Sequence, residues 1–364
     1  MKESDKFSSY FEFRVAQRSD LEEIMTFIRQ YWRENHILGN DKEFFLYEHG
    51  TSKKNLNFVI AKSKHTNKLQ SIQGFIPYST NKKKLHICGV FSKTHPENKV
   101  PFLGLETMRR MLQFTEPVTY CGIGTNSKTW LPLVKKFFNR HVGVMSHYYM
   151  LNENFKDFKI AVPDFIEDTI EKAKSPTDLY LKEIYNFSEI KNELYSLKIS
   201  DNLPYKSGHY IKRRYFENPI FNYKTYKLLA HSKSLLGLVI MREMSHEDRK
   251  ILSLIDFIGD IEKLGKAGDA FEKLMYLRNY EYIDCLCEGV NDKIFLDIGF
   301  NKKEHNGKTI IPTYFEPFVQ ENVQIHFEKS SSSLVLFKGD SDADRPNSPK
   351  DIQAQSKALY KKNF

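Results

Sequence analysis

Short runs of alternating hydrophobic and polar residues dominate the first half of the chain. Three such runs, separated by polar turns, predict an antiparallel meander; they are 56–64, 68–79 and 83–93. After an irregular loop, apolar residues at helical spacing predict a helix over 105–114, and 118–126 predicts another strand. The first domain is therefore expected to be organised around the stretch from Ser71 to Asn126.

Further elements flank this stretch on both sides. A strand over 11–17 precedes a helix over 21–31, whose apolar residues recur every three or four positions, and a shorter helix begins near Asp41. Another helix is predicted over 129–138, and the apolar and aromatic run 142–152 suits a closing strand. A mixed sheet with helices on both faces is the expected result.

The second half repeats this order of elements, although not the residues. Three strands, a helix, a strand, a helix and a last strand are predicted at 224–233, 235–245, 249–259, 261–279, 281–289, 291–300 and 309–315. The charged stretch 162–206 has a helical pattern, and the polar segment after Lys338 predicts a tail with a structured start and a loose end. The expected fold class is α/β (α+β), with each domain a mixed, mostly antiparallel sheet flanked by helices. The predicted boundaries are 1–155, 156–338 and, for the tail, 339–364.

Length and composition favour two domains without a membrane segment. With 364 residues the chain exceeds one ordinary domain. No apolar run approaches membrane-spanning length and the first residues lack a signal-peptide pattern, so we expect a cytoplasmic protein. The cysteines lie in apolar, strand-like runs and are expected in the core, with neither disulfides nor metal; they are Cys88, Cys121, Cys285 and Cys287.

The formal charge of +9 indicates a surface that attracts anions. The lysines are scattered rather than gathered with aromatic residues into one reading motif, so no nucleic-acid partner is expected and phosphorylated small molecules fit as well. A helix beginning at Leu105, directly after Gly104, would expose its first N–H groups and offer a site for a phosphate or pyrophosphate. The alternative is that Gly104 is simply a helix-entry residue.

His36 is a further candidate from the residues alone. It lies four positions after Trp32, on one helical face if the first helix continues that far, and would then be placed to touch a substrate. The alternative is that both residues pack against and cap the end of that helix.

The order of elements and several segments resemble the GNAT N-acyltransferase fold, here in tandem. More narrowly, the chain resembles the bacterial nucleotide-sugar N-acyltransferases with two GNAT-like domains, which acylate an amino-dideoxy sugar for surface polysaccharide or flagellar glycan. The resemblance covers nearly the whole chain and rests on YWRENHIL, GFIPYS, PFLGLETMRRML, CGIGTN, HYYMLN, HYIKRRYFENPIFNY, YFEPFVQEN and GDSDADRPN.

This resemblance implies an acyl-CoA co-substrate bound to the first domain. Residues 99–104 take the place of the pyrophosphate loop Q/R-x-x-G-x-G/A, with lysine at its first position and phenylalanine at its first glycine. Backbone groups of the third meander strand would polarise the thioester carbonyl. The implied cofactor-binding residues are Gly89, Val90, Phe91, Lys99, Phe102, Leu103, Gly104, Leu105 and Asn126.

Three residues are candidates for handling the acceptor's amine. His86 is the titratable side chain on the strand beside the acyl chain, and its ordinary pKa suits deprotonation of an ammonium group, although it is equally an ordinary residue at the start of a strand. Glu316, restrained by the following proline, and Ser79 are the other two. Glu316 has the alternative interpretation of a surface glutamate.

The second domain is expected to bind the acceptor and to support the first. Its equivalent loop has Asp260 and Glu262 where phosphates would lie, which disfavours coenzyme A there. Arg213, Arg214 and Tyr215 are the candidates for gripping a sugar nucleotide's diphosphate, a basic helix end being the alternative. Two other functions stay open: a tandem-GNAT peptidyltransferase that uses aminoacyl-tRNA, and a non-catalytic binding module.

Overall fold

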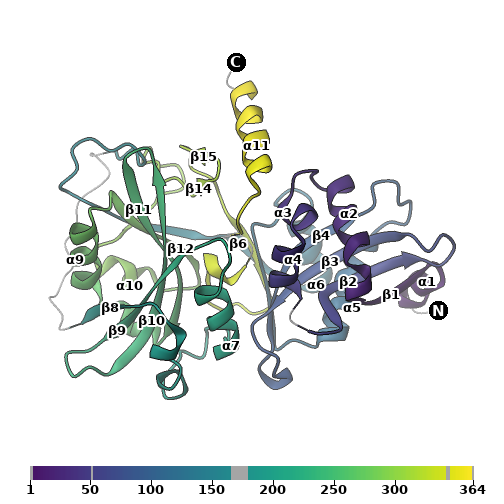
Figure 1. Ribbon diagram of the computed structural model, residues 1–364, viewed down its shortest axis with the longest axis horizontal. Coiled ribbons are helices and arrows are strands. Elements are labelled where there is room, and N and C mark those ends of the chain that lie inside the picture. Colours follow the sequence, from purple (N-terminus) through teal and green to yellow (C-terminus); the bar gives the residue numbers. More distant parts are fainter. Residues whose placement is uncertain (1–2, 51, 165–178, 342–344, 363–364) are drawn as a thin grey trace. The chain divides into compact units, whose positions relative to one another are not determined.

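The computed structural model describes residues 3–50, 52–164, 179–341 and 345–362. These residues form two compact units. Figure 1 shows their helices and strands, coloured by position in the sequence. The first comprises Met1–Arg140, Glu328–Ser330 and Arg345–Phe364, and the second comprises His141–Phe327 and Ser331–Asp344. Within the described residues, no helix is both long and apolar enough to cross a membrane.

The first sheet has the strand order β1-β2-β3-β4-β5-β16-β6. Its strands are β1 (Phe11–Gln17), β2 (Asn55–Ser63), β3 (Leu69–Pro77), β4 (His86–Thr94), β5 (Thr119–Ile123), β16 (His326–Lys329) and β6 (His141–Val144). The helices of the first unit are α1 (Glu3–Tyr10), α2 (Leu21–Tyr31), α3 (Ile37–Asn40), α4 (Lys42–His49), α5 (Leu103–Thr115), α6 (Trp130–Phe138) and α11 (Pro349–Lys362).

Alternation along β2 places α2, α3 and α4 on one face of the first sheet and α5 on the other. Ile60 packs in a core with residues of α2, α3 and α4, whereas the neighbouring Ala61 packs against Leu103 of α5. The predicted meander is confirmed, because β2, β3 and β4 pair antiparallel in sequence order. Helix α5 then returns the chain to β5, which pairs parallel with β4.

The second sheet has the strand order β13-β7-β12-β11-β10-β9-β8, and β17 pairs with β12 beside this path. Its strands are β7 (Ser146–Leu151), β8 (Tyr180–Ile184), β9 (Tyr223–Leu229), β10 (Leu235–His246), β11 (Arg249–Gly259), β12 (Tyr282–Glu288), β13 (Asn301–Lys302) and β17 (Leu336–Phe337); β14 (Tyr314–Phe315) and β15 (Phe318–Val319) form a separate hairpin. The helices are α7 (Gly208–Ile211), α8 (Ile261–Leu264), α9 (Gly268–Arg278) and α10 (Asp292–Leu296). A core that includes Phe271 of α9 and Phe295 of α10 lies against this sheet.

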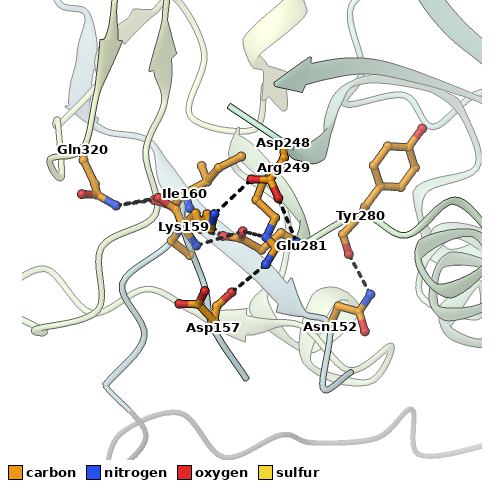
Figure 2. Close-up of polar contacts among 10 residues, drawn as sticks. Asn152, Asp157, Lys159, Ile160, Asp248, Arg249, Tyr280, Glu281 and Gln320 are labelled. Atoms are coloured by element: carbon orange, nitrogen blue, oxygen red, sulfur yellow. Dashed lines mark hydrogen bonds and ion pairs between the residues drawn. The ribbon is translucent and has the colours of Figure 1, made fainter. Parts of the chain in front are cut away.

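A buried carboxylate fixes the segment that follows β7 in the second unit (Figure 2). Glu281, which is fully buried, accepts hydrogen bonds from the backbone N–H groups of Lys159, Ile160 and Ala161 at 2.8–3.0 Å. Arg249 also lies near that carboxylate, with its Nε 3.7 Å from Oε2. Three backbone donors and one cation compensate the desolvation of Glu281, so its role is structural.

Two sequence predictions are corrected by the strand pairings. The run 142–152, expected as one closing strand, forms β6 in the first sheet and β7 in the second, because periodicity predicts a strand but not its partner. The helical pattern expected over 162–206 is wrong for 180–206, where β8 pairs with β9 and short 3-10 turns follow; residues 165–178 lie outside the described residues.

The polar tail forms α11. Arg345, which precedes this helix, pairs with Glu48, and Asp351 in its first turn pairs with Arg33, both of the first unit.

Candidate functional site

Strands β4 and β5 separate after a short parallel ladder. The ladder consists of His86–Thr119, Ile87–Tyr120 and Cys88–Cys121, although β4 continues to Thr94 and β5 to Ile123. No further pair joins them within the part of the chain that the structure describes. The two strands therefore diverge beyond Cys88 and Cys121, and we call this divergence the opening between β4 and β5.

A β-bulge in β4 lies at this opening. Phe75 of β3 pairs with Gly89 and Gly74 pairs with Phe91, so Val90 is left without a partner on β3. A bulge of this kind bends a strand and re-aims its backbone groups. Gly89, Val90 and Phe91, expected from the sequence to face a thioester carbonyl, are thus the residues at which β4 is irregular.

Helix α5 begins near the same strand with an uncapped N-terminus. It starts at Leu103, two residues before the predicted start, and its N-cap Phe102 makes no capping hydrogen bond through its side chain. Phe102 has φ of 63°, a left-handed conformation that is uncommon and strained for a bulky residue. A β-carbon on Gly104 would lie 3.0 Å from Thr94 Oγ1 of β4, so the first turn of α5 packs closely on the end of that strand. The N–H groups of Leu103, Gly104 and Leu105 are in the first turn of the helix, where backbone donors lack intrahelical acceptors.

Lys99 and Asn126 flank these elements. Lys99 is exposed in the loop between β4 and α5. Asn126 follows β5, and its Oδ1 accepts hydrogen bonds from the N–H groups of Lys128 and Thr129, which form the turn into α6. Asn126 is therefore already engaged in shaping this turn.

His86 and Ser79 lie away from the bulge. His86 is the first residue of β4, four residues before Val90, which corresponds to roughly 13 Å along a strand. Its Nδ1 is 2.6 Å from Thr119 Oγ1. Ser79 is 6% exposed, and its Oγ accepts from the N–H of Asn81 in the turn between β3 and β4. The structure therefore does not bring either side chain to the irregular part of β4.

His36 caps the start of α3. Its Nδ1 accepts from the N–H of Leu38 at 3.2 Å, and its ring packs against Phe91 at 5.8 Å. Burial, together with the positive charges of Arg345 and Arg33, lowers the pKa of His36 to about 3. His36 is therefore neutral at physiological pH, and the packing and capping interpretation describes its contacts.

Sequence reasoning missed a buried cluster beside the opening. Glu328 of β16 is 1% exposed, and its Oε1 accepts from Trp130 Nε1 at 2.6 Å and from Tyr120 Oη at 3.4 Å. A β-carbon on Gly89 would overlap with the Tyr120 hydroxyl, so this hydroxyl lies directly against β4. Burial raises the pKa of Glu328 to about 7. The sequence around Glu328 contains no motif that predicts this cluster, because its members come from three distant elements: Tyr120 from β5, Trp130 from α6 and Glu328 from β16.

The candidates of the second unit make contacts within that unit. Arg214 donates to the backbone oxygen of Ser341 at 2.9 Å, and Tyr215 donates to Asp256 at 2.5 Å; both side chains are buried. Arg213 is half-buried on the same turn. Glu316 accepts from Arg242 at 3.1 Å. Of the predicted diphosphate ligands, Arg213 is the one with partial exposure.

The second unit has its own bulge and parallel ladder. Strand β11 pairs parallel with β12 over Leu252–Leu254, and Ile255 has no partner on β10. Beyond the ladder, β17 pairs with β12, and a β-carbon on Gly339 would lie 2.7 Å from Ile255 Cγ2. The chain's own segment 336–340 therefore occupies the position next to the bulge.

A buried charge cluster holds this segment in place. The ammonium group of Lys206 lies 2.6 Å from Asp256 of β11 and 2.7 Å from Asp340, and all three side chains are almost fully buried. Asp260, predicted to repel phosphates, caps α8 through the N–H of Glu262 and pairs with Lys198. Among the described residues, no group of three or more His, Cys, Asp or Glu side chains is arranged to hold a metal ion.

Comparison with known proteins identifies the fold. No family model matches the chain, and no curated protein does. A probable N-acyltransferase of unknown function from Enterococcus faecalis is similar in structure, with a TM-score of 0.54 at 9% identity, over 87% of this chain and 72% of that protein. A GCN5-related N-acetyltransferase from Anabaena variabilis has a TM-score of 0.51 at 10% identity, over 87% and 72%. The chain has the mixed α/β fold of the GCN5-related N-acetyltransferases.

Proposed function

We propose that the protein is an acyl-CoA-dependent N-acyltransferase and that its first unit holds the thioester. The observation that carries this proposal is the opening between β4 and β5, which has a bulge at Val90 on one side and the uncapped N-terminus of α5 at the end of β4. An extended thioester chain fits between two strands whose mutual ladder ends at Cys88–Cys121. The helix N-terminus then suits the pyrophosphate of coenzyme A.

The bulge would supply electrostatic stabilisation during acyl transfer. When an amine attacks the thioester carbonyl, negative charge develops on the carbonyl oxygen, and fixed backbone N–H groups lower the barrier. The N–H groups around Val90 are the donors we assign to this oxygen. No metal is required, because a thioester is already activated toward amines.

We further propose that the second unit is a second copy of the fold, which does not bind the cofactor. It binds the acceptor and supports the first unit. Its order of elements repeats that of the first unit, and its own segment 336–340 lies where an acyl-CoA chain would otherwise pass. The buried Lys206 cluster stabilises that segment.

For the acceptor, we propose a nucleotide-linked amino sugar of the kind acylated in bacterial surface-glycan synthesis. The support is the resemblance of the sequence to that family and the formal charge of +9, which favours an anionic substrate. Thiol release from acetyl-CoA should be measured with dTDP-, UDP- and GDP-linked amino sugars, with free glucosamine and with a charged tRNA. Release with the nucleotide sugars supports the proposal, whereas thiol release with the charged tRNA alone would show acylation of its amino group instead. Peptidyl transfer releases no thiol; loss of the aminoacyl group from the tRNA to an added amine, without thiol release from any of the sugars, would replace the proposal by that reaction.

Replacement of Arg213 by alanine should weaken binding of such an acceptor. One charged hydrogen bond to a diphosphate contributes ~1.5–3 kcal/mol, so the acceptor's KM should rise tenfold or more while the KM for acetyl-CoA stays unchanged. Lys212→Ala, an exposed cation next to Arg213, is the matched control. Equal effects of the two substitutions would show that general charge, and not Arg213, attracts the acceptor.

A further inference from the structure

Glu328 is a buried carboxylate with an incomplete set of partners. Its Oε1 accepts two hydrogen bonds, whereas Oε2 is buried and has no hydrogen-bond partner among the residues that the structure describes. A buried carboxylate with an unsatisfied oxygen is costly to the folded state. This cost distinguishes Glu328 from Glu281 of the second unit, whose carboxylate receives three backbone N–H groups.

The Tyr120 side chain connects Glu328 to the bulged strand β4, and two glycines leave space for it and for the glutamate. Tyr120 donates to Glu328 with the same hydroxyl that lies against Gly89, one residue before the bulge. A β-carbon on Gly122 would lie 3.1 Å from Glu328 Cγ. Glycine at both positions therefore leaves space for the tyrosine and for the glutamate. The Tyr120 side chain, 2% exposed, lies between the half-buried Gly89 and the buried carboxylate.

We propose that Tyr120 and Glu328 form a proton path for acyl transfer: Tyr120 Oη takes the proton of the attacking amine and passes its own proton to Glu328. This inference rests on the proposed function above. Tyr120 is the group that meets the reacting amine, and Glu328 acts through it.

With this path, every bond and proton of the acyl transfer is accounted for. The amine nitrogen forms a bond to the carbonyl carbon, the C–S bond breaks, and its electron pair leaves on the sulfur of coenzyme A. The proton stored on Glu328 returns through Tyr120 Oη to this thiolate, so the products are an amide and a free thiol and the protein regains its starting state. Burial raises the pKa of Tyr120 well above its ordinary value, so the hydroxyl passes a proton on without remaining as tyrosinate.

The ionisation of Glu328 sets the direction of the pH dependence. Burial raises the pKa of Glu328 to about 7. The hydrogen bond from Trp130, the positive charge of Arg140 and the hydrogen bond from Tyr120 act in the opposite direction and lower it. The other titratable groups that face the pair are Cys88 and Cys121. Only the ionised carboxylate accepts a proton, so the rate of transfer falls as the pH decreases through about 7. A pKa near neutrality also suits a group that must both accept and return a proton.

The test compares Glu328→Gln and Tyr120→Phe with Tyr78→Phe. Tyr78 is a fully buried tyrosine of the same unit whose hydroxyl contacts Cys121 Sγ at 3.5 Å. The donor is acetyl-CoA, and the acceptor is the amine of the panel above that the wild type acylates fastest. Calorimetry with acetyl-CoA and circular dichroism accompany the kinetics.

Both path variants should lower kcat by about 100-fold or more while their Kd for acetyl-CoA stays within about twofold of the wild type. Glu328→Gln should also remove the ionisation near pH 7 from the profile of kcat/KM, and Tyr78→Phe should keep both the rate and the profile. A folded Glu328→Gln variant with wild-type kcat, or with the ionisation retained, overturns the proton path alone. A wild type that neither binds acetyl-CoA nor acylates any amine of the panel overturns the proposed function, and the path with it.

Discussion

Replacement of Gly104 by glutamate should strongly weaken binding of acyl-CoA to the protein. The new carboxylate would lie in the first turn of α5, where the N–H groups of Leu103, Gly104 and Leu105 have no capping side chain. It would repel the pyrophosphate and compete with it for these donors. A loss of about 100-fold in affinity, which corresponds to roughly 2.7 kcal/mol, is expected in calorimetry with acetyl-CoA.

The fold should survive this substitution, since an acidic residue in the first turn of a helix interacts favourably with the helix dipole. Gly104→Gln has the same shape without the charge and is the matched control. It should bind acetyl-CoA better than the glutamate variant and show an unchanged circular-dichroism spectrum. Wild-type affinity in Gly104→Glu would place the cofactor elsewhere.

Replacement of Lys206 by methionine should strongly lower the free energy of unfolding of the second unit. It removes the cation from between Asp256 and Asp340 and leaves two carboxylates facing each other in the interior of that unit. Breaking a buried ion pair by removing one partner costs about 3–5 kcal/mol. The loss should be seen in urea unfolding followed by a probe of the second unit.

Lys198→Met provides the comparison within the same unit. Lys198 pairs with Asp260, but its side chain is 81% exposed, so the change should cost less than about 1 kcal/mol. If Lys206→Met lies within that same range, the cluster does not hold segment 336–340. Binding of acetyl-CoA to the first unit should be unaffected by either substitution, provided that the sample is folded.

The sequence predicts the local part of this fold well. The alternating runs at 56–64, 68–79 and 83–93 become β2, β3 and β4, because the side-chain period of a strand is visible in a few residues. The sequence likewise predicts a helix N-terminus at the end of the loop that leads to Gly104, and the structure displaces its start by only two residues. Both features depend on neighbours along the chain.

Non-local features could not be predicted in the same way. Strand β16 joins the first sheet beside β5 although 202 residues (124–325) separate them in sequence, and β7 pairs within the second sheet. Glu328 acquires its perturbed pKa only from this arrangement, through burial beside Tyr120 and Trp130. Arg214 and Tyr215 have a sequence pattern that suits phosphate recognition. In the fold both are buried, and Arg214 donates to Ser341 while Tyr215 donates to Asp256.

The most direct test of the central claim is a crystal structure of the protein grown with excess coenzyme A. We expect one molecule per chain, with its pyrophosphate at the N–H groups of Leu103, Gly104 and Leu105 and its pantetheine arm between β4 and β5 beside Val90. The second unit should show no such molecule, because segment 336–340 lies next to its bulge. Coenzyme A bound instead at Asp260–Leu264, or an empty opening between β4 and β5 at saturating ligand, would contradict the account.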